Sequence, residues 1–183
     1  LYEVIKYGVI SSPNLFNQIG RDLAAIFKHD AEVLVPIIAE SCRIKANIVA
    51  KDERESGLRR TLNFGHTVGH AIETVSRYRR FRHGEAVAYG MLAAAPIAVS
   101  KQLLKDEDRR ALAAIIAQLG PLPSVSDLST NQILEAIHHD KKVLKGQLHV
   151  VLPTMIGDTT IVSDVTEDDL EGALRAIGMR RAD

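Results

Sequence analysis

The sequence predicts a mainly helical domain that carries one small β-hairpin, and three observations lead to this fold class. First, the 183 residues are 46% apolar and 25% charged, the balance of a globular domain with a buried core. Second, 21 alanines and 19 leucines stand against four tyrosines, four phenylalanines and no tryptophan, which favours helices over a β-sandwich. Third, apolar residues recur at helical spacing over most of the chain.

The first three helices are expected between residues 2 and 50. Apolar positions over 2–10 predict a helix that ends before Pro13. Pro13 suits the first turn of a short second helix, with Ser12 as its N-cap. Residues 31–50 repeat isoleucine, leucine and valine at helical spacing and predict a long helix in spite of Pro36.

Four further helices are expected over residues 62–76, 84–104, 106–119 and 130–138. The first of them is interrupted early by Gly65 and Gly69. The segment 84–104 is the most apolar of the chain, so we expect it to run through the centre of the domain.

The pattern changes near the C-terminus. Two short β-branched runs, 147–152 and 159–162, are separated by residues 155–158 and predict a hairpin. Thr166, with Asp169 three positions on, predicts the capping box of a last helix.

Composition excludes several classes of protein. The 23 basic and 23 acidic residues cancel, so the electrostatic footprint of a nucleic-acid-binding protein is missing. The longest uncharged run, 86–100, is shorter than the roughly 20 residues of a membrane span, and we expect no membrane association. A single cysteine, Cys42, and no signal peptide predict a cytoplasmic protein. Because the chain opens at Leu1 in the middle of a helical pattern, we expect it to be a fragment.

The densest polar cluster lies in residues 59–73. His66 and His70 are four apart and would share one face of a helix, the spacing at which two imidazoles chelate a metal. Gly65, just before His66, and Gly69, between the two histidines, would let a ligand or a neighbouring helix approach the backbone. The alternative is a solvated helix face. On these residues alone, the expected ligands are His66, His70, and Glu73 or His83.

Three other polar groups each have a structural alternative. His83, ahead of the apolar helix, could complete a metal site or merely cap that helix. Glu3 and Lys6 share one helical turn and could form a surface ion pair. The Asp140-Lys141-Lys142 run could bind an anion, although an exposed turn is the simpler interpretation. Together these groups suit a divalent metal that acts on an oxygen-rich anion, without identifying the reaction.

Six motifs in order resemble the 3-dehydroquinate synthase family over essentially the whole chain. They include LNFGHTVGHAIE at 62–73 and HGEAVA at 83–88. The others lie at 3–8, 43–49, 52–59, and 139–142 followed by Gly146 and 150–153.

The resemblance implies a two-domain enzyme, of which residues 1–183 would be the C-terminal metal- and substrate-binding domain. The N-terminal Rossmann-like NAD domain would be absent, since no glycine-rich dinucleotide fingerprint occurs, and NAD-binding residues therefore stay unassigned. Zn²⁺, or Co²⁺, would be held by Glu3, His66 and His83. His70 would then contact the substrate or relay a proton instead of binding the metal.

By the same resemblance, His70, Lys6 and Asn63 would be catalytic. The substrate would be bound by Lys45, Arg59, Asn63, His70, Lys141 and Lys142. The implied reaction converts 3-deoxy-D-arabino-heptulosonate 7-phosphate to 3-dehydroquinate and phosphate in the shikimate pathway, with NAD and a divalent metal.

Partners implied by the resemblance are the sugar-phosphate substrate, the missing NAD domain and a second copy in a homodimer, without nucleic acid or membrane. The fragment alone is expected to be inactive. Two alternatives remain: a related sugar-phosphate cyclase of the 2-deoxy-scyllo-inosose or epi-valiolone synthase type, and a non-catalytic metal-binding or dimerisation module.

Overall fold

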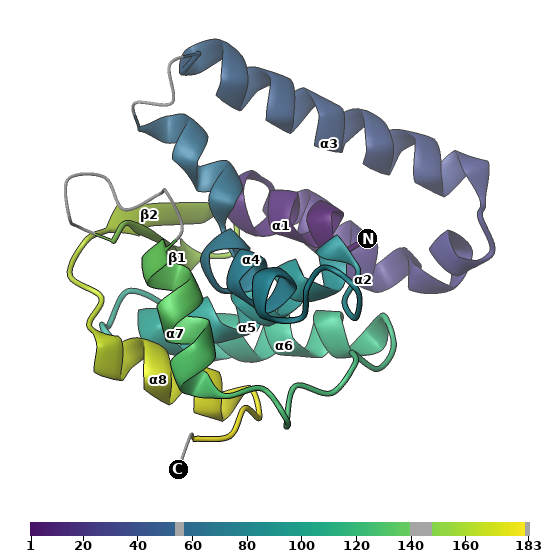
Figure 1. The fold of residues 1–183 in the computed structure, drawn as a ribbon. Coiled ribbons are helices and arrows are strands. Elements are labelled where there is room, and N and C mark those ends of the chain that lie inside the picture. The colour runs from purple at the N-terminus through teal and green to yellow at the C-terminus, as the bar shows by residue number, and fades with distance from the viewer. Residues whose placement is uncertain (54–56, 140–147, 182–183) are drawn as a thin grey trace.

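Residues 1–53, 57–139 and 148–181 are described by the structure, a computed structural model (Figure 1). Within them the chain forms eight α-helices, one 3₁₀ helix and one two-stranded hairpin, which confirms the predicted fold class. The elements are α1 (Tyr2–Ser11), α2 (Pro13–Phe27), α3 (Ala31–Lys51), η1 (Leu58–Asn63), α4 (His66–Val75), α5 (His83–Ser100), α6 (Asp106–Gln118), α7 (Thr130–His139), β1 (Val150–Met155), β2 (Asp158–Val162) and α8 (Glu167–Ala176).

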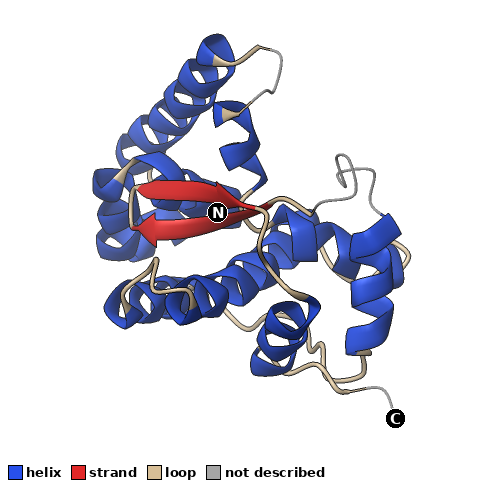
Figure 2. Cartoon of the chain, turned by 90° about the vertical axis from the view of Figure 1, so that its left-hand side faces the viewer, coloured by secondary structure: helices blue, strands red, loops and turns tan. Residues whose placement is uncertain are grey.

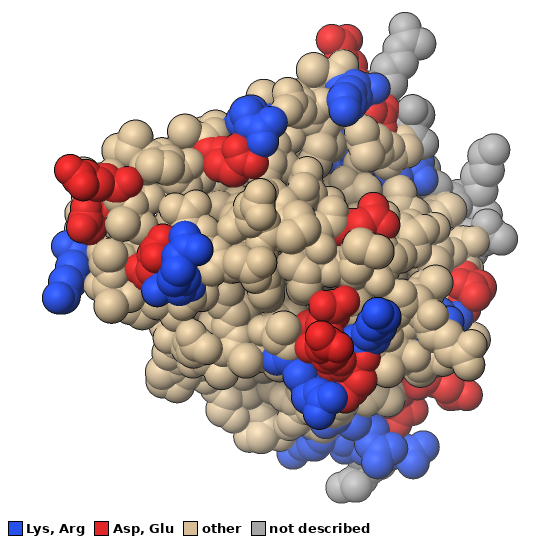
Figure 3. Space-filling view, turned by 180° about the vertical axis from the view of Figure 1, so that it is seen from behind, with Lys and Arg blue, Asp and Glu red and all other residues tan. Residues whose placement is uncertain are grey.

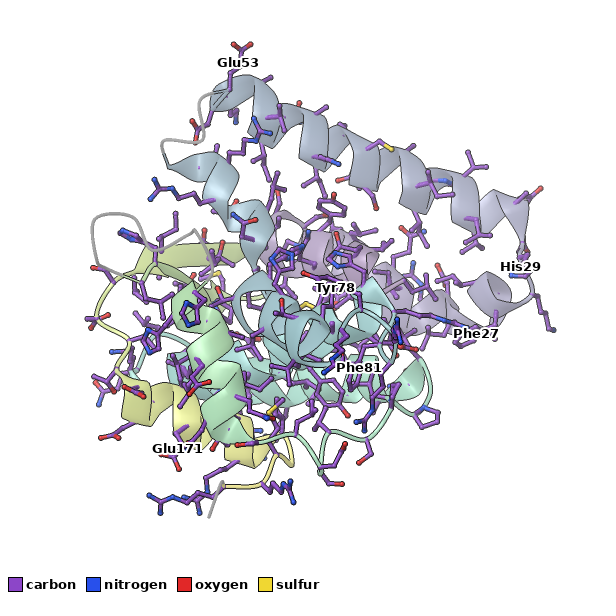
Figure 4. All side chains as sticks on the ribbon, viewed as in Figure 1. Phe27, His29, Glu53, Tyr78, Phe81 and Glu171 are labelled. Carbon is purple, nitrogen blue, oxygen red and sulfur yellow. The ribbon has the colours of Figure 1, made fainter. Side chains whose placement is uncertain are left out.

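The helices are arranged around a central pair. Helices α4 and α5 pack on each other, α7 covers α4, and α8 packs on α5 and α7. Helix α3 runs across the top of the molecule above α1 and α2, from the turn at Phe27 and His29 to Glu53 (Figures 1 and 4). The hairpin lies against α1 and α5, between the upper and the lower helices (Figure 2).

Helix α5 forms the centre of the core, as predicted. Eleven of its residues are buried, among them Val87 and Met91 with no exposed surface. It ends at Ser100 and not at residue 104, because Gln102 takes a left-handed conformation with φ 59°. None of the helices in the described residues is long and apolar enough to cross a bilayer.

Two other predicted helix limits were wrong. The expected helix 62–76 begins only at His66, because Gly65 has a left-handed φ of 77° and the preceding residues form η1. The second helix was predicted to be short, but it has 15 residues. Its predicted cap is confirmed, since the Ser12 hydroxyl accepts a hydrogen bond from the Leu15 amide at 3.2 Å.

The hairpin is tighter than predicted and is placed further along the chain. Met155 and Asp158 pair as strand residues, so the turn contains only Ile156 and Gly157. Gly157 has φ 105° and donates its amide to the Val9 carbonyl at 2.8 Å, which joins the hairpin to α1. Residue 147, the predicted start of the first strand, lies outside the described residues, and that strand begins at Val150.

The N-terminus of the last helix, α8, has the predicted cap. Thr166 accepts from the Asp169 amide at 3.1 Å, while the Asp169 carboxylate accepts from the Thr166 amide at 2.9 Å. The capping box is thus confirmed.

Over the face seen in Figure 3, acidic and basic side chains lie close to one another, in keeping with the balanced charge of the sequence.

Glycines bring α4 and α5 close together. A Cβ atom added to Gly90 would lie 1.7 Å from the Gly65 carbonyl oxygen. One added to Gly69 would lie 3.1 Å from the Ala86 carbonyl oxygen. The two helices therefore touch backbone to backbone, which gives the glycines of the 62–73 motif a packing role. This contact places His66, at the start of α4, near His83, at the start of α5.

Candidate metal centre

Three helix ends bring the predicted metal ligands together. Glu3 comes from the first turn of α1, His66 from the first turn of α4 and His83 from the first turn of α5. One potential ligand atom from each lies within 4.8 Å of the other two. Among the described residues, one other set of three donors meets the same distance, namely His70, Glu73 and His83. Neither set contains both His66 and His70, the pair of histidines on α4.

Hydrogen bonds fix which ring nitrogens are available. The Nδ1 of His66 lies 3.1 Å from the Phe64 carbonyl oxygen, and the Nδ1 of His83 lies 3.1 Å from Oε1 of Glu73. Both partners are acceptors, so both Nδ1 atoms must carry the proton and donate it. Each neutral ring then keeps the lone pair of Nε2, the form in which histidine binds a metal.

The carboxylate of Glu3 has one occupied and one open oxygen. Its Oε2 accepts a hydrogen bond from Lys6 Nζ at 2.8 Å. Its Oε1 is buried and has no hydrogen-bond partner among the described residues. That Oε1 lies 3.9 Å from His66 Nε2, so two lone pairs face each other across a gap. A buried acceptor without a donor is costly, and a cation bound between these atoms would relieve that cost. The residues present therefore fit a divalent metal.

The environment of His66 keeps its ring neutral. The pKa of His66 is lowered to about 4, first because the side chain is desolvated by burial and second because the ammonium of Lys6 lies nearby. Near pH 7 the ring carries no proton on Nε2. Metal binding then needs no proton release from this ligand.

This depressed pKa predicts a pH-dependent stability of the metal-free chain. An unfolded His66 takes up a proton as the pH falls below 6.5, whereas the folded one does so only near pH 4. The unfolded state binds more protons in that window, so stability is lost as the pH falls through it. We expect His66 to cost about 3 kcal/mol of unfolding free energy between pH 7 and pH 4.

Urea unfolding of the metal-free chain at several pH values, with a His66→Gln variant as reference, measures this contribution. The wild-type chain should lose more stability than the variant between pH 6.5 and pH 4. Parallel curves for the two proteins would contradict the assignment.

Lys6 forms an ion pair with Glu3, as their spacing allowed, but Lys6 is not at the surface. It is only 3% exposed. Its pKa is lowered, chiefly because burial penalises the ammonium, and also by the like charge of Lys45, while Glu3 opposes the shift. The structure therefore buries a lysine beside the predicted metal ligand, at the position that sequence analysis assigned to catalysis.

The other predicted substrate residues lie on neighbouring elements. Lys45 is exposed on α3 and close enough to Lys6 to affect its pKa. Arg59 and Asn63 lie on η1, and the guanidinium of Arg59 donates to the Glu53 carbonyl at 3.1 Å. Asn63 is the last residue of η1, three positions before His66.

The start of η1 is held by a residue that sequence analysis left out. The Asp52 carboxylate accepts from the backbone amides of Gly57 at 2.8 Å and Arg59 at 2.9 Å. Asp52 lies within the charged run of residues 51–55, which gave no signal of this role. Lys141 and Lys142 lie outside the described residues.

A cavity of about 730 Å³ opens beside His83, between α4 and α7. His70, Glu73 and His83 line one side of it, and Tyr78 lies near the junction of α4 and α5 (Figure 4). Its volume falls within the range of about 300–1,000 Å³ that is usual for small-molecule sites. The lining residues Thr74, Gln132 and Glu135 were not predicted from the sequence, since polar residues on an amphipathic helix usually face solvent.

Sequence comparisons with known proteins agree on one family. Residues 1–143 match the family described as 3-dehydroquinate synthase C-terminal. The 3-dehydroquinate synthase of Solibacter usitatus is 42% identical over 176 residues, which cover 96% of this chain and 49% of that protein. The 3-dehydroquinate synthase of a Nostoc species is 44% identical over 176 residues, which cover 94% of this chain and 48% of that protein. The chain spans about half the length of the curated relatives it matches.

Solved structures share the fold at lower sequence identity. A 2-epi-5-epi-valiolone synthase from Streptomyces hygroscopicus subsp. jinggangensis, with NAD+ and Zn2+ bound, superposes with a TM-score of 0.83 at 22% identity. A 2-deoxy-scyllo-inosose synthase, complexed with carbaglucose-6-phosphate, NAD+ and Co2+, superposes with a TM-score of 0.72 at 22% identity. Each comparison covers 96% of this chain and 49% of the other.

Proposed function

The chain belongs to the 3-dehydroquinate synthase C-terminal family, and on that premise we propose that residues 1–183 form the metal- and substrate-binding part of a 3-dehydroquinate synthase. The reaction would be the conversion of 3-deoxy-D-arabino-heptulosonate 7-phosphate to 3-dehydroquinate and phosphate. The observation that carries the proposal is the convergence of the buried, unpartnered Oε1 of Glu3 with Nε2 of His66, at 3.9 Å, and with a ring nitrogen of His83.

Glu3, His66 and His83 would hold the metal, with Zn²⁺ or Co²⁺ as the candidates. Three protein ligands leave coordination positions for oxygen atoms of the substrate. When bound, the ion would supply a Lewis acid that polarises a substrate hydroxyl. The structures that share the fold, with Zn2+ in one and Co2+ in the other, support this choice of ions.

The cationic side chains around the centre suit a substrate with a phosphate and a carboxylate. Lys6 is buried beside Glu3, Lys45 is near enough to Lys6 to lower its pKa, and Arg59 lies on η1. We assign these three to anion binding and orientation, with Lys141 and Lys142 as further candidates. A desolvated ammonium interacts more strongly with an anion than a solvated one does.

His70 is the candidate for proton transfer. It is half-buried, lies one turn after His66 and lines the cavity. Its ring centre is 5.2 Å from that of His66 and 6.0 Å from that of His83. A histidine at this distance can exchange a proton with a substrate held at the centre without being a ligand itself. Asn63 would orient a substrate oxygen from the end of η1.

NAD and its binding domain would come from the other half of a longer protein, as the lengths of the curated relatives suggest. We further propose that the longer protein is a cytoplasmic homodimer, with no nucleic-acid or membrane partner. The names of the relatives at 42–44% identity favour 3-dehydroquinate synthase over the other cyclases, whose structures are 22% identical.

Phosphate release tests the proposed function. We expect a longer protein that contains this chain and an NAD-binding half to release phosphate from 3-deoxy-D-arabino-heptulosonate 7-phosphate, and the 183-residue chain alone to release none above background. Turnover only of a sugar phosphate without a carboxylate would identify another cyclase. No turnover of either substrate class, with metal bound, would favour a non-catalytic module.

A further inference from the structure

We infer that Glu73 is a positioning residue of the metal centre, whose carboxylate holds the ring of His83 and leaves Nε2 as the nitrogen for a metal shared with Glu3 and His66. This inference rests on the proposed function, because it assumes that His83 is a metal ligand. The Nδ1 of His83 lies 3.1 Å from Oε1 of Glu73. The two residues come from different helices, α5 and α4, and stand ten positions apart in the sequence.

The two imidazoles of the centre are held in different ways. His66 is 9% exposed and donates to a backbone carbonyl, so packing and the main chain fix its ring. The side chain of His83 is 47% exposed, at the first position of its helix. Packing restrains such a ring weakly, and ordering it costs side-chain entropy. Glu73, which is 7% exposed, supplies a fixed acceptor for that ring.

The charge of Glu73 has a second effect. A carboxylate that accepts the Nδ1–H bond of an imidazole makes the opposite nitrogen a stronger donor to a metal. It also selects the tautomer with the lone pair on Nε2. A neutral acceptor would retain the orientation and the tautomer but supply less of the electrostatic gain.

Glu73 could instead be a ligand itself, since His70, Glu73 and His83 form the second set of three donors. The hydrogen bonding favours the positioning role. Oε1 of Glu73 already has a partner in His83, whereas Oε1 of Glu3 is buried without one. The open coordination position is therefore at Glu3. One metal ion per chain is the stoichiometry that follows.

The test uses Glu73→Gln, which keeps a neutral acceptor, and Glu73→Ala, which removes it. Glu85→Gln is the matched control, because Glu85 lies two residues after His83 and its carboxylate accepts a hydrogen bond from the Arg82 amide at 2.8 Å. Zinc affinity and stoichiometry are measured in the 183-residue chain by competition with a chelating dye, and the coordination of Co²⁺ by its visible absorption. Circular dichroism checks that each variant is folded.

We expect Glu73→Gln to weaken zinc binding about 10-fold and Glu73→Ala about 100-fold, the range for residues that orient metal ligands. The Co²⁺ spectrum should change in both variants, and Glu85→Gln should match the wild type in affinity and spectrum. If Glu73→Ala does not fold, the isosteric Glu73→Gln carries the test.

The outcomes separate the two proposals. Wild-type affinity and an unchanged Co²⁺ spectrum in the folded variants would overturn the role of Glu73 and leave the metal centre standing. Two zinc ions in the wild type and one in Glu73→Ala would make Glu73 a ligand, which also overturns the positioning role. A wild-type chain that binds no zinc would contradict the metal centre itself.

Discussion

Replacement of Gly90 by alanine is expected to lower the free energy of unfolding by more than about 3 kcal/mol, at or beyond the upper end for an overpacked core. The new Cβ would lie 1.7 Å from the Gly65 carbonyl oxygen, far inside any allowed contact. That oxygen belongs to the backbone at the start of α4 and accepts from the Gly69 amide, so it cannot move alone. Helices α4 and α5 would have to separate.

Gly172→Ala is the matched control for this substitution. Gly172 also lies inside a helix, but nothing lies within 4 Å of an added Cβ there. Alanine at such a position should stabilise the chain by about 0.5–1 kcal/mol, because it lowers the entropy of the unfolded state. Urea unfolding of both variants measures the two effects. A Gly90→Ala chain as stable as the wild type would show that α4 and α5 do not meet backbone to backbone.

Replacement of His66 by alanine is expected to weaken zinc binding more than about 100-fold, beyond the effect of residues that only orient a ligand. It removes one of three donors from a centre in which Nε2 of His66 faces Oε1 of Glu3 at 3.9 Å. Calorimetric titration of the 183-residue chain with zinc measures the change.

His70→Ala is the control, because it removes the same ring one turn further along α4. It should keep zinc affinity near that of the wild type and, in the longer protein, lower turnover about 10²–10⁴-fold, as expected for a lost general acid or base. Equal zinc affinity after His66→Ala would count against this ligand. Loss of zinc with His70→Ala would instead support the set of His70, Glu73 and His83.

Local sequence signals predicted the helices well, because amphipathic spacing and caps act over a few residues. The caps at Ser12 and Thr166 show this, since each hydroxyl accepts a backbone amide three positions on. The limits of α4 and the hairpin turn were less predictable. They depend on left-handed conformations at Gly65 and Gly157, and a glycine in a sequence does not reveal whether it adopts one.

The site was predictable in its residue types but not in its geometry. The spacing of His66 and His70 favoured a pair of ligands from one helix, whereas the structure places His66 beside Glu3 and His83, from two other helices. Lys6 is buried and Oε1 of Glu3 has no partner among the described residues on α1, a helix that packs on α2, α3 and α5. Such long-range contacts have no periodic signature in the sequence.

Anomalous X-ray diffraction at the zinc edge, from crystals of the chain grown with zinc, tests the metal centre most directly. We predict one anomalous peak per chain, at about 2.0–2.2 Å from Oε1 of Glu3, Nε2 of His66 and Nε2 of His83. A peak bound instead by His70, Glu73 and His83, or no peak near Glu3, would contradict the assignment.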